Sequence, residues 1–242
     1  MRDLRHKVTA EGFDAVCKRL MASIRRREAS TPDPVDCPYC GRRWDGDVEG
    51  RVCPACRKQV AAKELEAAWK RLCPPDYRKT DPARLNQDAL ARVMAWEYGP
   101  RGLLLVGPTD QGKTRTMYLL LRRLLEQGLR VEAFEPLGFG HACQRHFTRG
   151  TGPDWFDGLV AADVVFFDDL GKEPMTPRVE AELYGVVERR AARERPILAT
   201  TNMTGARLVR AASEDRGAPL VRRLREFCEV MVFGKEANDE QA

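Results

Sequence analysis

The sequence lacks the apolar runs that membrane passage requires. None of its 242 residues lie in a stretch that approaches the roughly 18 consecutive apolar residues of a membrane-spanning helix. The first residues, MRDLRHKVTAEGFDAVCKRL, carry charges throughout and contain no apolar segment of the kind found in secretion signals. These absences predict a soluble, cytoplasmic protein without membrane contact.

Histidine is scarce, and the charge imbalance is small. The three histidines are His6, His141 and His146. Lys and Arg exceed Asp and Glu by 41 to 36, and the surplus lies wholly in the first 100 residues, with 20 basic and 15 acidic residues. A surplus of this size fits nucleic-acid binding and a solvated basic helix about equally well. The sequence contains no internal repeat.

Eight cysteines are present, and four of them form two C-x-x-C pairs, Cys37 with Cys40 and Cys53 with Cys56. In a cytosolic protein such pairs favour a metal over disulfides. Four thiolates supply a closed tetrahedral set for structural zinc, and so short a segment needs the metal to fold. Redox dithiols and an iron–sulfur cluster are the alternatives. Small buried hydrophobes are expected at the other cysteines: Cys17, Cys73, Cys143 and Cys228.

The N-terminal part is predicted to be a separate module. Apolar residues at three- and four-residue spacings predict a helix over 8–28, and another is expected over 59–72 after the cysteine segment at 37–56. The segment CPPDYRKTDP, 73–82, predicts an extended linker because each proline disfavours helix in the residue before it. The expected organisation is an N-terminal module over 1–72, a linker over 73–85, a second domain over 86–234 and a disordered tail over 235–242.

Short apolar runs alternate with helical patterns through the second domain. Strands are expected at 103–106, 130–135, 164–168, 197–201 and 230–233, and helices at 86–97, 113–127, 137–148, 177–194, 204–212 and 217–227. Strands that alternate with helices predict an α/β fold in which helices cover both faces of a parallel sheet.

The segment GPTDQGKT satisfies the phosphate-binding pattern G-x-x-x-x-G-K-[ST] between an apolar run and a helical pattern. Nucleotide contacts are therefore expected from Gly107, Pro108, Thr109, Asp110, Gln111, Gly112, Lys113 and Thr114. Backbone N–H groups of such a loop form a concave anion site, to which Lys113 adds charge for the β- and γ-phosphates. Thr114 offers a hydroxyl to Mg²⁺. Asp110 brings a carboxylate to the loop, where it either weakens nucleotide binding or points outward.

The segment VVFFDDLG, 164–171, ends an apolar run in two carboxylates. About 60 residues after a phosphate-binding loop, this pattern predicts a Walker B strand, in which Asp168 helps to hold magnesium and Asp169 orients the attacking water. The alternative is that the two acids cap the next helix.

Three further segments carry candidate side chains. PILATTNM ends a strand in Thr201 and Asn202, and a polar group there can reach the γ-phosphate or merely form a turn. LVRRLREF presents its arginines either to solvent or to the nucleotide of a neighbouring subunit. FGHACQRHFTRG, 139–150, mixes aromatic and basic residues; its phenylalanines are expected to pack inward, and Arg145 and Arg149 are equally consistent with solvent and with single-stranded DNA.

In this order and spacing, GPTDQGKT, DVVFFDDLGKE, the helix with ERR at 188–190, PILATTNM and LVRRLRE resemble the DnaC/IstB-type AAA+ ATPases over residues 74–234. The resemblance implies an AAA+ core without a C-terminal lid, and a place for CPPDY beside the adenine pocket. It assigns Walker A to Lys113 and Thr114 and sensor 1 to Asn202. The arginine finger would be Arg223, with Arg222 and Arg225 as the other choices. Asp169 stands where AAA+ ATPases usually carry Glu, which is expected to slow hydrolysis.

The resemblance implies an ATPase that uses ATP and Mg²⁺ and assembles into a homo-oligomer, and the cysteine pairs add Zn²⁺ as an expected cofactor. The first hypothesis is a loader of a replicative helicase onto single-stranded DNA, with the N-terminal module gripping the helicase. The second is a transposition helper that marks target DNA for a transposase. A third, of another class, is a zinc-dependent adaptor that uses nucleotide as a structural switch.

Overall fold

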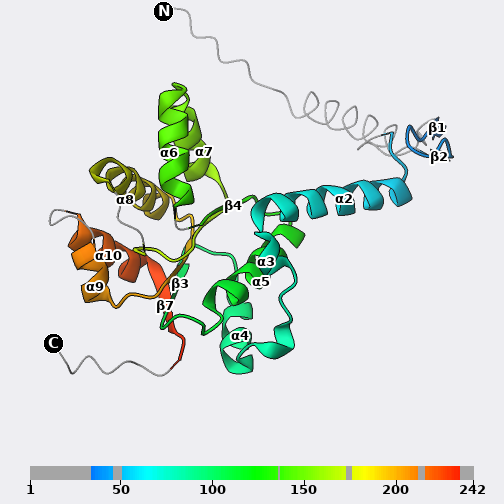
Figure 1. Cartoon of the computed structure of the whole chain (residues 1–242). Coiled ribbons are helices and arrows are strands. Elements are labelled where there is room, and N and C mark those ends of the chain that lie inside the picture. Colours follow the sequence, from blue (N-terminus) through cyan, green and yellow to red (C-terminus); the bar gives the residue numbers. More distant parts are fainter. Residues whose placement is uncertain (1–33, 46–50, 136, 173–175, 212–215, 235–242) are drawn as a thin grey trace, which may run out of the picture. The chain divides into compact units, whose positions relative to one another are not determined.

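Alternating apolar residues build the central sheet. In the computed structural model, Leu103 and Leu105 of β3 (Gly102–Val106) belong to one buried cluster and Leu104 to another, and β5 (Val164–Phe167) is divided in the same way. Strands buried on both faces are typical of a parallel sheet covered on both sides. Figure 1 shows α4 and α5 on one side of the strands and α8, α9 and α10 on the other.

The structure describes residues 34–45, 51–135, 137–172, 176–211 and 216–234, and the chain divides into two units, Met1–Glu64 and Leu65–Ala242. The expected helix at 8–28 and the tail at 235–242 lie outside the described residues. Among the described helices, none is long and apolar enough to cross a membrane.

The first unit is built around a two-stranded sheet. β1 (Pro34–Asp36) pairs with β2 (Arg43–Asp45) in antiparallel register, with Val35 opposite Trp44. The connecting turn is closed by the Cys37 N–H, which donates to the Arg42 carbonyl at 3.0 Å. The helix expected over 59–72 begins earlier, as α2 (Pro54–Leu72), because proline is tolerated in the first turn of a helix.

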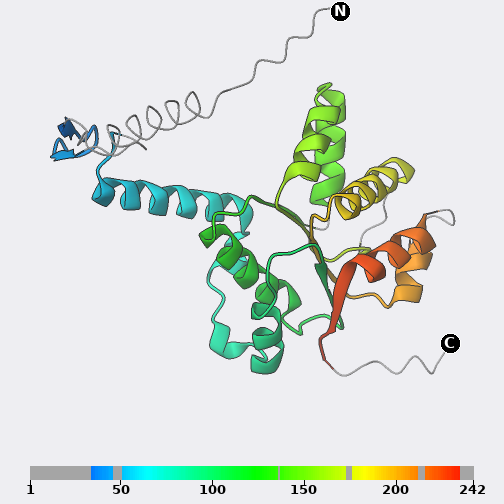
Figure 2. The ribbon, with the colours of Figure 1, turned by 180° about the vertical axis from the view of Figure 1, so that it is seen from behind.

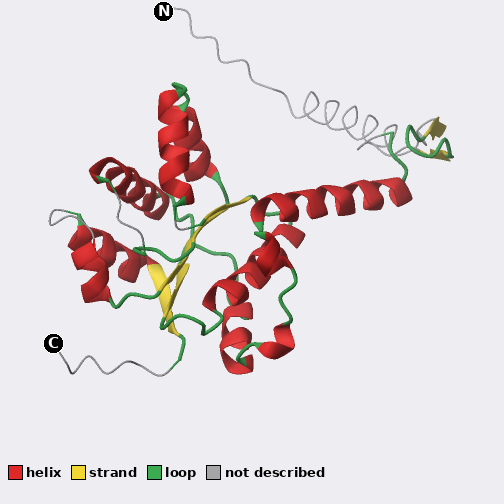
Figure 3. Cartoon of the chain, viewed as in Figure 1, coloured by secondary structure: helices red, strands yellow, loops and turns green. Residues whose placement is uncertain are grey.

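The second unit contains a 5-stranded parallel sheet in the order β4-β5-β6-β3-β7. Its remaining strands are β4 (Val131–Phe134), β6 (Ile197–Thr201) and β7 (Cys228–Val232). Its helices are α3 (Pro75–Arg78), η1 (Pro82–Arg84), α4 (Gln87–Met94), α5 (Lys113–Glu126), α6 (Gly138–Thr148), α7 (Gly152–Ala161), α8 (Pro177–Ala192), α9 (Gly205–Ala211) and α10 (Gly217–Phe227). The view from behind in Figure 2 and the colouring by secondary structure in Figure 3 show the same central strands between helices. The expected α/β fold is confirmed.

One expectation about local structure is wrong, and one helix was not predicted. The segment 73–82 was expected to be extended, but it contains α3 and the start of η1, each begun by a proline in its first turn. Helix α7 was not predicted from the sequence, because its first residues, Gly152 and a proline, are typical of a loop. The division between the two units falls at Glu64 and Leu65, and Trp69 and Cys73 pack in the core of the second unit.

The buried guanidinium of Arg190 joins α8 to the chain segments that lead into β5 and β6. It has no solvent exposure and donates to the carbonyl groups of Leu159, Ala162, Asp163 and Pro196 at 2.7–2.9 Å. Leu159 belongs to the last turn of α7, where carbonyl groups have no partner within the helix. Burial lowers the pKa of Arg190 to about 10, so the side chain is still charged at neutral pH.

We predict that Arg190→Met lowers the free energy of unfolding by about 3 kcal/mol or more, because several buried carbonyl groups lose their donor. Urea unfolding followed by circular dichroism measures the change. The control is Arg193→Met, an exposed position at the end of α8, which should change stability by less than about 0.5 kcal/mol. Equal effects of the two substitutions would contradict the role given to Arg190.

Candidate nucleotide site and four-cysteine centre

The phosphate-binding loop connects β3 to α5, and two of its glycines are required by geometry. Gly107 has φ +151°, and a Cβ there would lie 2.1 Å from the Phe233 carbonyl oxygen. Gly112 has φ +80° and precedes the first residue of α5. Side chains at these positions would block the close approach of the backbone and disfavour the left-handed turn. The loop is therefore held in a shape that points the start of α5 into a cleft.

The cleft has a volume of about 920 Å³ and is lined by the loop, by Asp169 and Asn202, and by the segment from Asp76 to Asn86. Tyr77 stacks on Tyr118 with ring centroids 5.1 Å apart, and Arg115 lies over Tyr77 at 5.4 Å. Arg115 also donates to the carbonyl of Asp76 at 3.0 Å. These contacts hold the segment that was expected to be a linker as a wall of the cleft.

Asp110 lies on the exposed side of the loop and lines the cleft. Its φ of +63° is a left-handed conformation that glycine adopts more easily than aspartate. The side chain is thus part of the cleft wall. Burial lowers the pKa of Lys113, and the charge of Asp110 is one of those that oppose this shift.

Lys113 is buried and reaches back over the loop. Its Nζ donates to the carbonyl oxygens of Gly107 at 2.7 Å and Pro108 at 2.6 Å, and to Oδ1 of Asn202 at 2.6 Å. Burial lowers its pKa, while the charges of Asp169 and Asp168 oppose that shift. The ammonium group of Lys113 and the side chain of Asn202 are therefore in direct contact.

Asp168 follows β5 and accepts hydrogen bonds from two hydroxyl groups. Thr114 Oγ1 donates to Asp168 Oδ1 at 2.8 Å, and Thr200 Oγ1 donates to the same oxygen at 2.6 Å. Burial raises the pKa of Asp168, while these two hydrogen bonds lower it. A hydroxyl and a carboxylate side by side are the hard oxygen donors that Mg²⁺ prefers, so Thr114 and Asp168 fit the proposed magnesium ligands.

The sequence analysis did not identify Thr200. It lies on β6 beside β5, the strand that Asp168 follows. Its hydroxyl also accepts a hydrogen bond from the Asp169 N–H at 2.8 Å. Two successive threonines at the end of β6 could have indicated it, but only Thr201 and Asn202 were predicted as candidate site residues. Thr201 is buried and donates to the Leu170 carbonyl at 2.7 Å, away from the cleft lining.

Asp169 is held between an amide and an ammonium group. Asn202 Nδ2 donates to its Oδ1 at 3.1 Å, and Lys172 Nζ lies 3.3 Å from its Oδ2. The φ of Asp169 is +46°, a left-handed conformation. Lys172 lines the cleft and was not identified from the sequence, although it lies in the turn directly after the acidic pair.

The arginines of α10 are placed apart from this cleft. Arg223 pairs with Glu188 of α8 at 2.6 Å and with Glu226 at 3.3 Å, while Arg222 is exposed and lies 3.9 Å from Glu226. Arg225 is also exposed. None of the three lines the cleft of its own chain, so a role at a nucleotide requires a second copy of the chain.

The aromatic and basic segment around α6 divides as its spacing suggests. Phe139 and Cys143 are buried in the core, and Phe147 packs partly against it. Arg145 and Arg149 are exposed, and neither is paired in the described part of the chain. The inward packing of the phenylalanines is confirmed, and the DNA contact of the two arginines stays a prediction.

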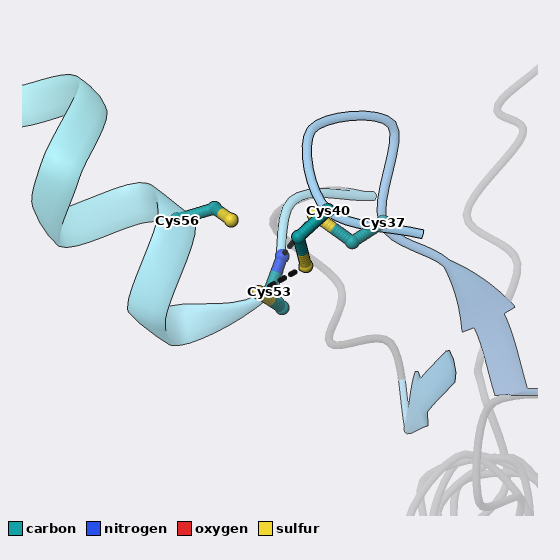
Figure 4. Close-up of side chains that lie close together, drawn as sticks. All are labelled: Cys37, Cys40, Cys53 and Cys56. Carbon is teal, nitrogen blue, oxygen red and sulfur yellow. Dashed lines mark hydrogen bonds between the residues drawn. The ribbon is translucent and has the colours of Figure 1, made fainter. Parts of the chain in front are cut away.

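The four cysteines of the first unit form one cluster (Figure 4), with all sulfur atoms within 4.8 Å of one another. Cys40 Sγ and Cys53 Sγ lie 3.7 Å apart. Sulfurs around one tetrahedral Zn²⁺ lie about 3.8 Å apart when each bond is about 2.3 Å. Three cysteines precede α2 and Cys56 lies in its first turn, so the cluster fits a structural zinc centre.

The pKa values of two thiols in this cluster shift in opposite directions. Burial alone would raise the pKa of Cys37, but backbone N–H groups of Cys53, Tyr39 and Cys40 lower it to about 6. Hydrogen bonds to Cys40 and Cys53 raise the pKa of Cys56 to about 12. A divalent cation that binds all four sulfurs would stabilise the thiolate form of each, including Cys56.

Comparison with known proteins gives a partial sequence match and several structural matches. A family model described as RNA helicase matches residues 103–193, which include the phosphate-binding loop and the two acids after β5. This segment is less than half of the chain. No curated protein matches the sequence.

Several solved structures share the fold at TM-scores above 0.5, among them the following three. DnaI has a TM-score of 0.57 and 16% identity, covering 67% of this chain and 95% of its own. The DnaC helicase loader has a TM-score of 0.51 and 19% identity, covering 61% of this chain and 87% of its own. The replication initiator DnaA bound to AMPPCP and single-stranded DNA has a TM-score of 0.54 and 16% identity, covering 67% of this chain and 51% of its own.

This chain spans about half the length of the DnaA chains that it matches. At these identities the similarity concerns the fold. The second unit therefore shares the α/β fold of these DnaI, DnaC and DnaA structures, and the chain also contains a four-cysteine module.

We predict that the purified protein contains about one zinc ion per chain, because one tetrahedral set of thiolates is available. Cys40→Ser should release the metal and unfold the first unit, while nucleotide binding by the second unit persists. Metal analysis and limited proteolysis measure both effects, and Cys73→Ser, a buried cysteine outside the cluster, serves as the control. An iron chromophore, or no metal, would contradict a zinc centre.

We also predict opposite outcomes for two substitutions in the cleft. Lys113→Ala should abolish ATP binding, because the ammonium group faces the most charged part of the ligand. Asp169→Asn should bind ATP with nearly unchanged affinity and lose most turnover, because an amide cannot orient or polarise the attacking water in the same way. Binding of a fluorescent ATP analogue and phosphate release separate the two. Wild-type turnover in Asp169→Asn would show that this carboxylate has another role.

Proposed function

We propose that the protein is an ATP-dependent loader of a replicative DNA helicase onto single-stranded DNA. The observation that carries the proposal is the hydrogen-bonded set of Lys113, Thr114, Asp168, Asp169 and Asn202, of which all but the buried Asp168 line one cleft, with Arg223 outside it. Such a set is suited to bind and hydrolyse a nucleoside triphosphate, and the arginine finger, Arg223, would come from a neighbouring copy.

The proposed use of ATP follows from these positions. Lys113 and the loop N–H groups would hold the phosphates, and Thr114 and Asp168 would hold Mg²⁺, which would supply positive charge at the transferring phosphoryl group. Asp169, after β5, and Asn202, after β6, orient the attacking water. Arg223 of a neighbour completes the site, so that ATP binding favours assembly and hydrolysis favours release.

The partner assignment is supported by the fold of the helicase loader DnaC and of DnaI. The replication initiator with the same fold was solved with single-stranded DNA. Residues 1–72, with the zinc module, are proposed to grip the helicase. Arg145 and Arg149 on the exposed side of α6 are candidates for DNA contact.

A second candidate is a zinc-dependent adaptor that binds nucleotide and hydrolyses little. One observation favours it: Lys172 pairs with Asp169 at 3.3 Å and neutralises the carboxylate that would act on water. The two functions differ in turnover and in its dependence on assembly.

We predict that Arg223→Ala binds ATP normally but loses hydrolysis, and that mixing it with Asp169→Asn restores activity. In an equal mixture, about one quarter of the interfaces combine an intact cleft with an intact arginine, since each interface takes different residues from its two subunits. Phosphate release over a dilution series measures both effects, and wild-type turnover per chain should rise with concentration. Flat specific activity without rescue would favour the adaptor.

The helicase partner is tested separately. A hexameric replicative helicase should co-purify with the wild-type protein and load onto a closed single-stranded DNA circle only in its presence. Capture of a transposase in place of the helicase would replace the loader by the transposition helper.

A further inference from the structure

The guanidinium of Arg223 is held by two carboxylates of its own chain. Nε donates to Glu188 Oε1 at 2.6 Å and Nη2 donates to Glu188 Oε2 at 2.9 Å. The third nitrogen, Nη1, donates to Glu226 Oε2 at 3.3 Å. Every nitrogen of the side chain is therefore occupied in the isolated chain.

The two carboxylates hold Arg223 in different ways. Glu188 lies on α8 and binds one whole edge of the guanidinium, which fixes the plane of the group between two helices. Glu226 lies one turn further along α10, makes a single longer contact and is 54% exposed. A single exposed ion pair is weak, so Glu226 is the partner that another anion can displace.

The surroundings of the pair leave room for such an anion. A hollow of about 280 Å³ borders Arg223, Glu188 and Glu226, and it is open beside Ala191, Ala192 and Phe227. Hydrogen bonds from Arg223 hold the pKa of Glu188 below its usual range, against a smaller opposing effect of burial, so Glu188 is ionised at neutral pH.

We propose that Glu188 is a positioning residue that aims Arg223 at the nucleotide of a neighbouring subunit, and that Glu226 shields Arg223 until the terminal phosphate displaces it. The proposal rests on the proposed ATPase and names the regulation of its site. A guanidinium whose plane is fixed in advance loses less rotational freedom on binding phosphate. Glu226 supplies a negative charge that must leave first, which makes the isolated chain a poor activator.

The two glutamates should therefore have opposite effects on turnover. In the full-length, zinc-loaded protein at saturating ATP, Glu188→Gln should lower turnover about tenfold, because the arginine is no longer oriented. Glu226→Gln should raise turnover two- to threefold at low protein concentration, about the effect of losing one exposed charge contact. ATP affinity, measured with a fluorescent analogue, should stay within about twofold for both.

The matched control is Glu182→Gln, which removes another α8 carboxylate that pairs with an arginine, Arg178, at 3.4 Å. Its turnover should equal that of the wild type. Glu188→Gln mixed with Asp169→Asn should regain activity, because the intact cleft of the first chain meets the oriented arginine of the second. A change that merely disturbed the fold of the cleft would not be rescued. Adding Glu188→Gln to Arg223→Ala should cause no further loss, since both act through one group.

The outcomes separate this proposal from the one on which it rests. If Arg223→Ala is inactive while Glu188→Gln turns over at the wild-type rate, or is not rescued by mixing, the positioning role is wrong and the assembled ATPase stands. If Glu226→Gln loses turnover as Glu188→Gln does, shielding is wrong. If Arg223→Ala itself retains full turnover, both the finger and its positioning are overturned.

Discussion

A parallel sheet that is buried on both faces leaves only the ends of its strands for polar chemistry. β3, β6 and β5 are neighbours in this sheet, so the phosphate-binding loop, Asn202 and the two acids leave it at the same edge. The hydrogen bonds of Asp168 depend on this strand order, because Thr200 of β6 and Thr114 at the start of α5 both donate to one of its oxygens. A change in strand order would separate these donors, whatever the sequence of each segment.

At the opposite edge of the sheet, where the strands begin, the buried side chain of Arg190 donates hydrogen bonds to backbone carbonyl groups. Its acceptors include carbonyl groups just before β5 and β6, at Asp163 and Pro196, so the amino ends of these strands are tied to α8. Buried carbonyl groups at this edge accept hydrogen bonds from Arg190, whereas polar groups at the carboxyl edge face a cleft of about 920 Å³. Polar groups that do not need a ligand lie at one end of the strands, and those that can hold one lie at the other.

The order of strands and helices could be predicted from the sequence because apolar periodicity reports burial directly. The loop residues that line the cleft could be predicted because a phosphate-binding loop has a fixed spacing. The short helices after Cys73 could not, since proline signals both a break and a helix start, and only the packing of Tyr77 on Tyr118 decides between them. Thr200 and Lys172 were missed for another reason: their roles depend on contacts across strands and turns, which no local pattern encodes. The partner of Arg223 was missed likewise, because Glu188 is 35 residues away.

Two groups proposed for hydrolysis carry a counter-charge in the isolated chain. Asp169 lies against Lys172, and Arg223 lies against Glu188 and Glu226. Both arrangements stabilise the separate subunit, because each charge is compensated where no ligand is bound. Under the proposed function, a nucleotide between two subunits would change both balances at once: its terminal phosphate would compete with Asp169 for Lys172 and with Glu226 for Arg223. Lys172, which lines the cleft, would then pair with the phosphate in place of the carboxylate and free Asp169 to act on water. In this scheme the same anion that is to be cleaved releases both side chains, so a chain without a neighbour keeps them compensated and assembly becomes a condition of turnover.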